Sequence, residues 1–231
     1  MRPAHFVNSA AFMLSVRAMS GECLTPVQER PRVWIVDDDA GVQAALARLL
    51  RATALAVETF GSGPALLERL EQTRPHCLVL DLALPGLNGL DLFRLLHERG
   101  QPIPVVFVTG EGDVTSSVQA MKEGAVDYLQ KPVDADALLS AVMRGLAQDA
   151  EWRQARERIQ AASQLLATLT PREHEVLLHV ATGKSNKRIA AELGTAEKTV
   201  KVHRGRVMHK LGAASIVDLV HLTERAAGFA G

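Results

Sequence analysis

The sequence predicts two domains of different classes, an α/β domain on a parallel five-stranded sheet and then an all-α domain. Between residues 33 and 148, short apolar runs alternate with segments of helical periodicity. After residue 166 only helical segments follow, with a tight turn at Gly194. The charge is also divided, because residues 32–150 hold 10 Lys and Arg against 16 Asp and Glu, whereas residues 151–231 hold 13 against 8. A basic second half indicates nucleic acid as a candidate partner.

The first half of the chain consists of five strand–helix units in sequence. Each expected strand is a short run rich in apolar residues, and apolar residues at helical spacing follow it. Such a (βα)5 pattern predicts a parallel sheet whose right-handed crossovers cover both faces. The expected strands are 33–36, 56–60, 77–82, 104–110 and 127–132, and the expected helices are 40–52, 63–73, 88–99, 114–123 and 134–148.

The second half begins with a helical linker at residues 149–165, which contains neither Pro nor Gly and could continue the fifth helix. Thr170 then caps a helix with Pro171 at its first position, and Glu173 completes a capping box. A short helix in KSNKRIAAEL, the turn at Gly194, a longer helix in AEKTVKVHRGRVMHKL and a last helix near 214–226 complete the chain. Four short helices around one tight turn indicate a helix-turn-helix domain.

Composition excludes several other classes. No stretch approaches the roughly 18 apolar residues of a membrane span, and Arg17 interrupts the apolar N-terminal segment before a signal peptide could form. We interpret residues 1–31 as an N-terminal extension, which could be disordered. Cys23 and Cys77 lack metal-ligand spacing, so neither a disulfide nor zinc is expected. The expected compartment is the cytoplasm, without a membrane partner.

Polar side chains follow the ends of four expected strands. Because ligands bind at the carboxyl ends of the strands in such a sheet, these residues should meet at one edge. The run of aspartates by itself would be explained better by a solvated turn, but the matching residues at the other strand ends favour a binding site. They are Asp37, Asp38 and Asp39 after the first strand, Asp81 at the third, Thr109 at the fourth, and Lys131 with Pro132 at the fifth.

Repulsion among these carboxylates favours a hard divalent cation with oxygen ligands, and we expect Mg²⁺ that keeps several waters. One carboxylate can then attack a phosphoryl group while the metal and a lysine offset the developing charge. Asp81 is the candidate nucleophile, because it ends a buried strand and the following LALPG turn exposes it. Lys131 supplies positive charge for one phosphoryl oxygen, and the Thr109 hydroxyl can donate to another.

At these residues the chain resembles the receiver domain of bacterial two-component response regulators, over about residues 32–148. The segments VDDD, LVLDLALPGLNG, VTGEGD and AMKEGAVDYLQKP match its acid pair, phosphoacceptor, switch threonine and Lys-Pro motifs in order. The resemblance implies a flavodoxin-like fold with Asp81 as phosphoacceptor. It further implies direct contact of Asp38 and Asp81 with Mg²⁺, the Ala83 carbonyl as a third ligand, Asp37 acting through water, Thr109 and Tyr128 as the switch pair, and Lys131 before a cis Pro132.

The helix after Gly194 carries a basic stripe. Val200, Val207 and Leu211 follow three- to four-residue spacing and should face the core. The second helix of a helix-turn-helix enters the major groove, although a solvated helix face would have the same composition. The expected DNA contacts are Lys198, Thr199, Lys201, Val202, His203 and Arg206 on this helix, with Lys201 at a base edge and Val202 at a thymine methyl, and Lys184, Asn186 and Lys187 at phosphates from the preceding helix.

Here the chain resembles the LuxR-type DNA-binding domain of FixJ/NarL-class regulators, over about residues 166–226. The segments LTPREHEVL, ATGKSNKRIAAEL and TVKVHRGRVMHKL recur in that family's order and spacing. Ala196 departs from the usual capping Ser, so we expect the cap from Thr195 or elsewhere. Gly205 stands where a longer side chain is usual, and a base contact could be missing there. A glycine inside a helix also costs about 1 kcal/mol relative to alanine.

Together the two resemblances imply a response regulator, not an enzyme. Its partners would be a cognate sensor histidine kinase, promoter DNA, RNA polymerase and, after phosphorylation, a second copy of the chain. Phosphorylation of Asp81 would bias a two-state equilibrium, and two DNA-binding domains would then bind paired half-sites through a dimer seam on the last helix.

Two alternatives stay open. One is an aspartate-nucleophile phosphatase, although such enzymes have a second aspartate where Ala83 stands, two residues after Asp81. The other is a phosphorylation-independent DNA binder with a vestigial receiver.

Overall fold

The computed structural model describes residues 30–100, 102–110 and 114–228. Of the N-terminal extension expected at 1–31, all but the last two residues lie outside this range, as do residues 111–113 of the VTGEGD motif. The described α/β region contains β1 (Arg32–Val36), α1 (Ala40–Arg51), β2 (Ala56–Phe60), α2 (Gly63–Leu70), β3 (Cys77–Asp81), α3 (Gly89–Glu98), β4 (Val105–Thr109), α4 (Val114–Lys122), β5 (Asp127–Gln130) and the first part of α5 (Ala135–Ala167).

The five strands form one parallel sheet in the order β2-β1-β3-β4-β5, which confirms the predicted (βα)5 fold. Because the chain runs from β1 to β2 on one side and from β2 across to β3 on the other, β1 and β3 are neighbours at the switch point. The three central strands are buried almost throughout, whereas the edge strands β2 and β5 are only partly buried.

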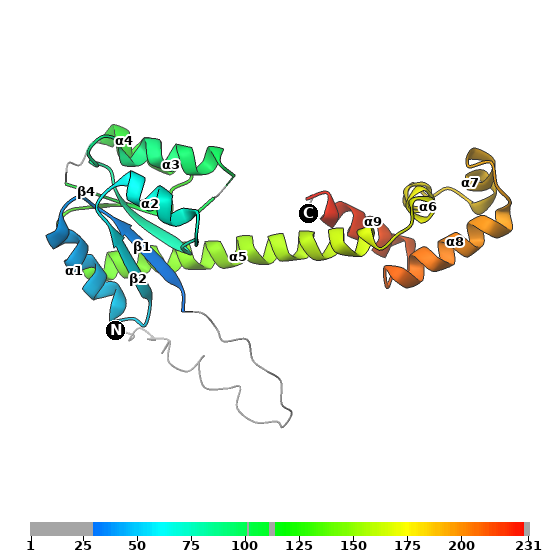
Figure 1. The fold of residues 1–231 in the computed structure, drawn as a ribbon, viewed down its shortest axis with the longest axis horizontal. Coiled ribbons are helices and arrows are strands. Elements are labelled where there is room, and N and C mark those ends of the chain that lie inside the picture. Colours follow the sequence, from blue (N-terminus) through cyan, green and yellow to red (C-terminus); the bar gives the residue numbers. More distant parts are fainter. Residues whose placement is uncertain (1–29, 101, 111–113, 229–231) are drawn as a thin grey trace, which may run out of the picture. The chain divides into compact units, whose positions relative to one another are not determined.

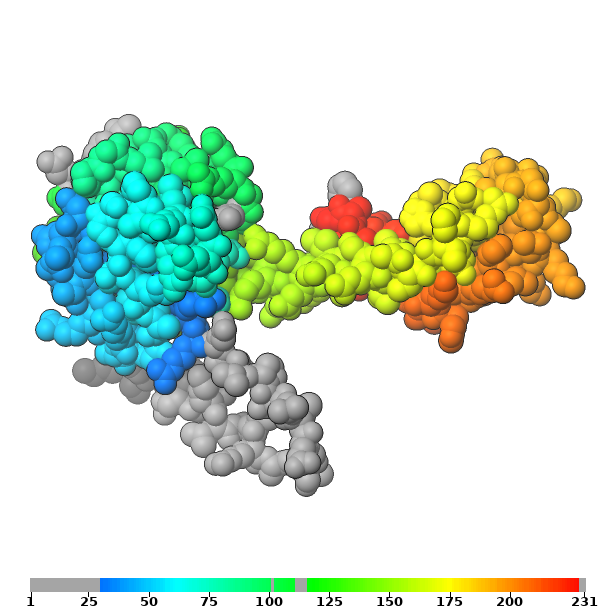
Figure 2. Space-filling view, in the orientation of Figure 1, coloured from blue at the N-terminus to red at the C-terminus, as the bar shows by residue number. Residues whose placement is uncertain are grey.

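Two apolar layers hold helices on opposite faces of this sheet (Figure 1). Helices α1 and α5 bury Leu50 and Leu138 against one face. Helices α2, α3 and α4 bury Leu66, Phe93 and Ala120 against the other. In the space-filling view α2 and α3 close over that second face (Figure 2). The sheet is therefore covered on both faces, and functional side chains are left at the carboxyl ends of its strands.

Helix α5 is continuous from Ala135 to Ala167, so the linker expected at 149–165 is an extension of the fifth helix. Gly145 on this helix lies against Cys77 of β3, where a Cβ would come within 2.7 Å of the cysteine sulfur. One turn later Asp149 is only 1% exposed and forms ion pairs with Arg74 at 3.3 Å and Arg153 at 2.8 Å. The α/β region therefore holds the helix beyond residue 148.

The C-terminal region contains four helices, as predicted: α6 (Pro171–Ala181), α7 (Asn186–Glu192), α8 (Glu197–Lys210) and α9 (Ile216–Ala226). They enclose a separate core that includes Val176, Ile189, Val200, Val207 and Leu219, and Leu166 of α5 packs against it. The capping box of Thr170 and Glu173 is present. Gly194 adopts a φ of +61°, which allows the tight turn between α7 and α8.

No helix among the described residues combines the length and the apolar character that crossing a bilayer requires.

Candidate functional site

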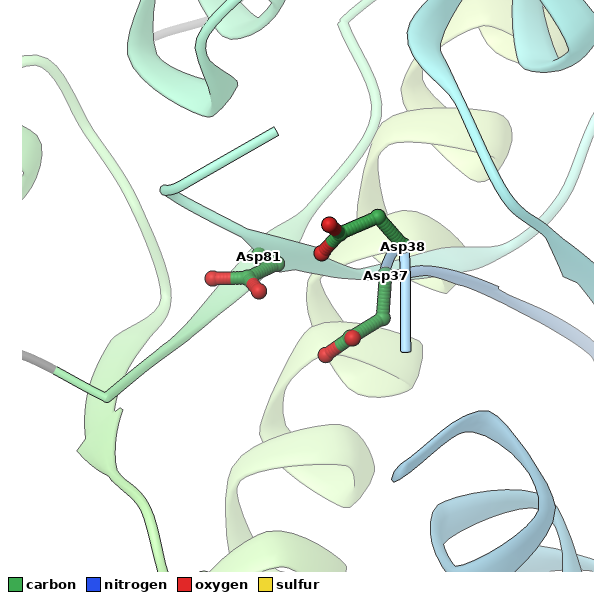
Figure 3. A group of neighbouring side chains, drawn as sticks. All are labelled: Asp37, Asp38 and Asp81. Atoms are coloured by element: carbon green, nitrogen blue, oxygen red, sulfur yellow. The ribbon is translucent and has the colours of Figure 1, made fainter. Parts of the chain in front are cut away.

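Three aspartates meet at the carboxyl end of the sheet, as the sequence predicted (Figure 3). Asp37 and Asp38 follow β1, and Asp81 is the last residue of the neighbouring β3. One carboxylate oxygen from each lies within 4.8 Å of the others. Asp37 and Asp81 are buried, whereas Asp38 is exposed. We call these three residues and Lys131 the acidic edge.

Lys131 connects the two buried carboxylates. Its Nζ donates to Asp37 Oδ2 at 2.7 Å and to Asp81 Oδ2 at 2.8 Å. Its backbone N–H donates to the Thr109 carbonyl at 2.7 Å, and the bond between Lys131 and Pro132 is cis, as the receiver resemblance implied. Parts of the chain up to 94 residues apart therefore converge on one cluster.

The remaining oxygens of the buried pair accept backbone hydrogen bonds. Asp37 Oδ1 accepts from the N–H of Asp39 at 2.9 Å, and Asp81 Oδ1 accepts from the N–H of Ala83 at 3.1 Å. Both carboxylates are thereby fixed in orientation before any ligand binds.

Burial has the largest influence on Asp37 and raises the pKa of its carboxyl, against the opposing hydrogen bond from Lys131. Burial also disfavours the Lys131 ammonium, but the hydrogen bonds to Asp37 and Asp81 outweigh it and raise the lysine pKa. Three carboxylates and one ammonium leave the acidic edge with two formal negative charges. Hard oxygen donors with this charge suit a divalent cation such as Mg²⁺, and exposed Asp38 is the carboxylate open to solvent.

Neighbouring residues place these side chains. Asp39 points its carboxylate into α1, where it caps the helix by accepting from the N–H of Gly41 at 2.7 Å. The three aspartates expected at the metal therefore cluster, and Asp39 is a helix cap, the role that the sequence favoured for it over metal binding. The Gln43 amide donates to the Asp37 carbonyl at 2.6 Å. A Cβ on residue 89 would lie 2.3 Å from the Asp81 carbonyl oxygen, so Gly89 allows the backbone to pass under the candidate phosphoacceptor.

The other residues implied by the receiver resemblance lie on β4, on β5 and in the turn after β3. Thr109 is buried at the end of β4. Tyr128 on β5 is half-buried and packs against the layer formed by α2, α3 and α4. Ala83 lies in the exposed turn after β3. Their assigned roles as switch residues and metal ligand stay predictions.

The second candidate site is the basic stripe, which we define as the exposed cations Lys198, Lys201 and Arg206 of α8. Val200, Val207 and Leu211 are buried in the core, as expected, and this orientation turns the three cations outward. Thr199 and Val202 are also exposed, as a DNA contact requires, and Val202 is 47% exposed. His203 is the exception, because it is half-buried and its Nδ1 is enclosed.

The expected side-chain cap of α8 is absent. Ala196 occupies the N-cap position and no side chain, including that of Thr195, hydrogen-bonds there. The methyl side chain of alanine cannot accept a hydrogen bond. Thr195 lies one residue before the N-cap position, so its hydroxyl does not take the place of the cap. A Cβ on Gly205 would meet nothing within 4 Å, so no packing requires a glycine at that position.

The residues expected at phosphates differ in their partners. Lys184 forms an ion pair with Glu192, with Nζ donating to Oε2 at 2.5 Å. This hydrogen bond is the main cause that lowers the pKa of the Glu192 carboxyl. Asn186 accepts a hydrogen bond at Oδ1 from Arg204 of α8 at 3.2 Å. Lys187 is exposed. Sequence reasoning missed Arg204, because its proximity to Asn186, 18 residues away, follows only from how α7 and α8 pack.

An ion pair between buried Glu173 and exposed Lys210 fixes the C-terminal end of α8. Glu173, 2% exposed, accepts from Lys210 Nζ at 2.7 Å and from the backbone N–H of Thr170 at 2.9 Å. The hydrogen bond from Lys210 is the main cause that lowers the pKa of the Glu173 carboxyl to about 2. Lys210 also donates to the Thr168 carbonyl at 3.1 Å, which joins α8 to the end of α5.

Comparisons with known proteins find a family for each of the two regions. Residues 33–143 match the response regulator receiver domain family, and residues 167–223 match the bacterial regulatory proteins of the luxR family. The chain is 42% identical to nodulation protein W of Bradyrhizobium diazoefficiens over 87% of this chain and 88% of that protein. It is 39% identical to the transcriptional regulatory protein FixJ of Azorhizobium caulinodans, over 82% and 90%. The structure of response regulator StyR aligns with a TM-score of 0.73 at 46% identity, over 85% of this chain and 99% of that one.

Proposed function

The chain belongs to the two-component response regulators of the FixJ class, transcriptional regulators with a receiver and a LuxR-type DNA-binding domain, and we propose that phosphorylation of Asp81 controls its DNA binding. We assign residues 32–148 to the receiver, 149–165 to the helical linker and 166–231 to the DNA-binding domain. The observation that carries the proposal is the Lys131 ammonium, which lies 2.7 Å from Asp37 and 2.8 Å from Asp81.

Asp81 is placed to act as the nucleophile. A carboxylate oxygen of Asp81 would attack the phosphorus of a phosphohistidine on the partner kinase, forming an oxygen–phosphorus bond while the nitrogen–phosphorus bond breaks and the imidazole leaves. Mg²⁺ held by Asp37, Asp38, Asp81 and the Ala83 carbonyl would supply positive charge to the phosphoryl oxygens. Lys131 already contacts Asp81, so it can move with the charge onto the phosphoryl group.

The product carries nearly two additional negative charges in a confined site. We expect the Thr109 hydroxyl and Lys131 to be drawn toward them, and Tyr128 to repack on its side of the sheet. This change would bias an existing equilibrium between two receiver conformations. Two copies of the chain would then dimerise and bind paired half-sites in promoter DNA, where RNA polymerase is the further partner. Regulation of this kind would take place in the cytoplasm and would require no catalytic turnover.

In the DNA-binding domain, we propose that α8 enters the major groove. Lys201 and Val202 would meet base edges, and Lys198, Thr199, His203 and Arg206 would contact DNA around them. Lys184, Asn186 and Lys187 would approach phosphates from α7 and the loop before it. Lys184 would have to exchange Glu192 for a phosphate, which makes its contribution smaller than that of exposed Lys187.

The test is DNA footprinting and sedimentation of the full chain with and without a small-molecule phosphodonor plus Mg²⁺. We expect phosphodonor to shift the chain to dimers and to strengthen the footprint, and Asp81→Asn to abolish both changes. Asp39→Asn is the matched control, because asparagine caps a helix as well as aspartate does. Identical footprints and masses in both conditions, with DNA affinity unchanged in Asp81→Asn, would instead support a phosphorylation-independent DNA binder.

The phosphatase alternative makes a different prediction. It requires steady turnover of an added phosphoester, whereas a regulator takes up a single phosphoryl group for each molecule. The DNA-binding family match at residues 167–223 favours the regulator.

A further inference from the structure

Arg204 lies on the side of α8 that faces α7. It is half-buried, unlike exposed Arg206 two residues later on the same helix. Its Nη1 donates a hydrogen bond to Oδ1 of Asn186, the first residue of α7, at 3.2 Å. This bond links the groove-entering helix to the helix expected at the DNA backbone.

The donors and acceptors of the two side chains determine which end of the Asn186 amide pairs with Arg204 and which end stays available to another partner. A guanidinium has five N–H donors and no acceptor, so only the carbonyl oxygen of Asn186 can pair with it. The Asn186 NH₂ group therefore faces away from Arg204. Phosphate oxygens only accept hydrogen bonds, so an NH₂ donor is the end that a phosphate requires. The positive charge on Arg204 also polarises the amide and makes that NH₂ a stronger donor.

Two cations near α7 are paired with one acidic side chain, whereas Lys187 is exposed. Lys184 is paired with Glu192 at 2.5 Å, and Arg188 donates to the same carboxylate at 3.1 Å. The carbonyl oxygen of Asn186 accepts from Arg204, and its NH₂ group donates to no other residue that the structure describes, so a phosphate could bind there without displacing a partner.

We propose that Arg204 is a positioning residue for DNA recognition, which orients the Asn186 amide toward a backbone phosphate and does not itself contact DNA. The inference rests on the proposed function, since it assumes that α8 enters the groove while α7 lies at the backbone. It adds to that function a residue outside the expected contact set, together with the chemical group that the residue acts on.

Salt dependence separates positioning from direct contact. Each phosphate that a cation neutralises adds about 0.9 to the slope of log affinity against log salt concentration, whereas a neutral amide releases no counterion. Arg204→Met and Arg206→Met remove the same charge from the same helix, so they form a matched pair. Affinity of the full chain, with phosphodonor and Mg²⁺, would be measured between about 50 and 200 mM salt. The probe is a duplex that the wild-type chain selects from a random-sequence pool.

We expect Arg204→Met and Asn186→Ala each to weaken binding by about tenfold, the usual scale for removing one hydrogen bond to a charged group. The double variant should be no weaker than either single variant, and the slope should stay at its wild-type value. Arg206→Met should lower the slope by about 0.9 for each phosphate that residue 206 no longer neutralises, and it should be additive with Asn186→Ala. Arg204→Lys keeps the charge and a donor, and it should recover part of the affinity.

Three results would overturn the inference. In the first, Arg204→Met lowers the slope as Arg206→Met does, which makes Arg204 a direct contact. In the second, Arg204→Met and Asn186→Ala are additive, and in the third neither changes affinity. Thermal unfolding of each variant excludes loss of the fold, and Arg204→Lys covers the case in which Arg204→Met unfolds. If the wild-type chain selects no duplex from the pool, the proposed function itself fails.

Discussion

The acidic edge and the basic stripe hold their charges in opposite ways. In the acidic edge, the side chains of Asp37 and Asp81 are 2% and 4% exposed, and Lys131 pairs with both. In the basic stripe, Lys198, Lys201 and Arg206 are exposed, and none of them forms a salt bridge with another residue that the structure describes. The side chains of the acidic edge are held in place without a ligand, whereas the cations of the basic stripe are available to a partner that supplies negative charge.

This difference predicts different responses to mutation. Removing a buried charge leaves its partner uncompensated and affects both stability and chemistry. Removing an exposed charge takes away one interaction among many and leaves the fold unchanged. Three predictions test that contrast and a fourth tests the missing cap of α8, beginning with the largest expected effect.

Lys131→Met should destabilise the receiver by about 2 to 4 kcal/mol without Mg²⁺, because Asp37 and Asp81 would then repel each other without a cation between them. Mg²⁺ should restore more stability to this variant than it adds to the wild type, since the site has become more negative. Urea unfolding followed by the fluorescence of buried Trp34, in EDTA and in Mg²⁺, measures both effects. Arg94→Met is the control, because it breaks a more exposed pair with Glu123. An equal Mg²⁺ effect in Lys131→Met and wild type would contradict the acidic edge as the metal site.

Glu173 should make the DNA-binding domain sensitive to acid. Its carboxyl has a pKa of about 2 in the folded chain against 4.5 ordinarily, so its stabilisation is complete above pH 4.5 and is lost as pH falls toward 2. The pH dependence expected from Asp37 runs in the opposite direction. Its carboxyl pKa is raised in the folded chain, so its contribution to stability is lost as pH rises through the folded-state pKa. Hydrogen exchange of α8 in the full chain at several pH values should show the acid loss in wild type.

Glu173→Gln should lack this acid-dependent loss of α8 protection, and its protection at neutral pH should already be low. Glu175→Gln, an exposed position on the same helix, is the control and should follow wild type. If Glu173→Gln showed the same acid dependence as wild type, another group would be responsible.

Lys201→Ala should reduce specific DNA affinity by about 1 to 3 kcal/mol and relax preference at the base it contacts. Lys187→Ala should weaken binding to all sequences equally and lower the salt slope by about 1. Neither should change thermal unfolding, since both side chains are exposed. Binding of both variants to a panel of single-base mutants of the selected duplex measures the difference. A uniform loss for Lys201→Ala would move that residue to the phosphate backbone.

Ala196→Ser should have the smallest effect, a stabilisation of α8 by about 1 kcal/mol, because it supplies the missing cap acceptor. Thermal unfolding of the full chain, followed by circular dichroism, measures the gain. Ala191→Ser on α7 is the control, and there the same substitution should be slightly destabilising. A gain of equal size at both positions would show that capping is not the cause.

The sequence alone was sufficient for the order of the elements and for the acidic edge. Apolar strands alternating with helices predict a parallel sheet, and residues at the strand ends then lie along its carboxyl edge. This is why Asp37, Asp81 and Lys131 could be grouped although up to 94 residues separate them. The core positions of α8 followed from helical spacing in the same way, because spacing within one helix is a local property.

Tertiary structure decided what depends on how elements pack. It put Gly89 beneath Asp81, extended α5 past residue 148 and left α8 without a side-chain cap. It also brought Arg204 to Asn186 and Lys210 to Glu173. The two members of each pair lie on different helices, and the sequence does not determine which of their residues lie opposite each other. Periodicity specifies which face of an element is apolar. It does not specify which polar side chain lies opposite another across the interface, because that depends on the distance and angle at which two elements pack.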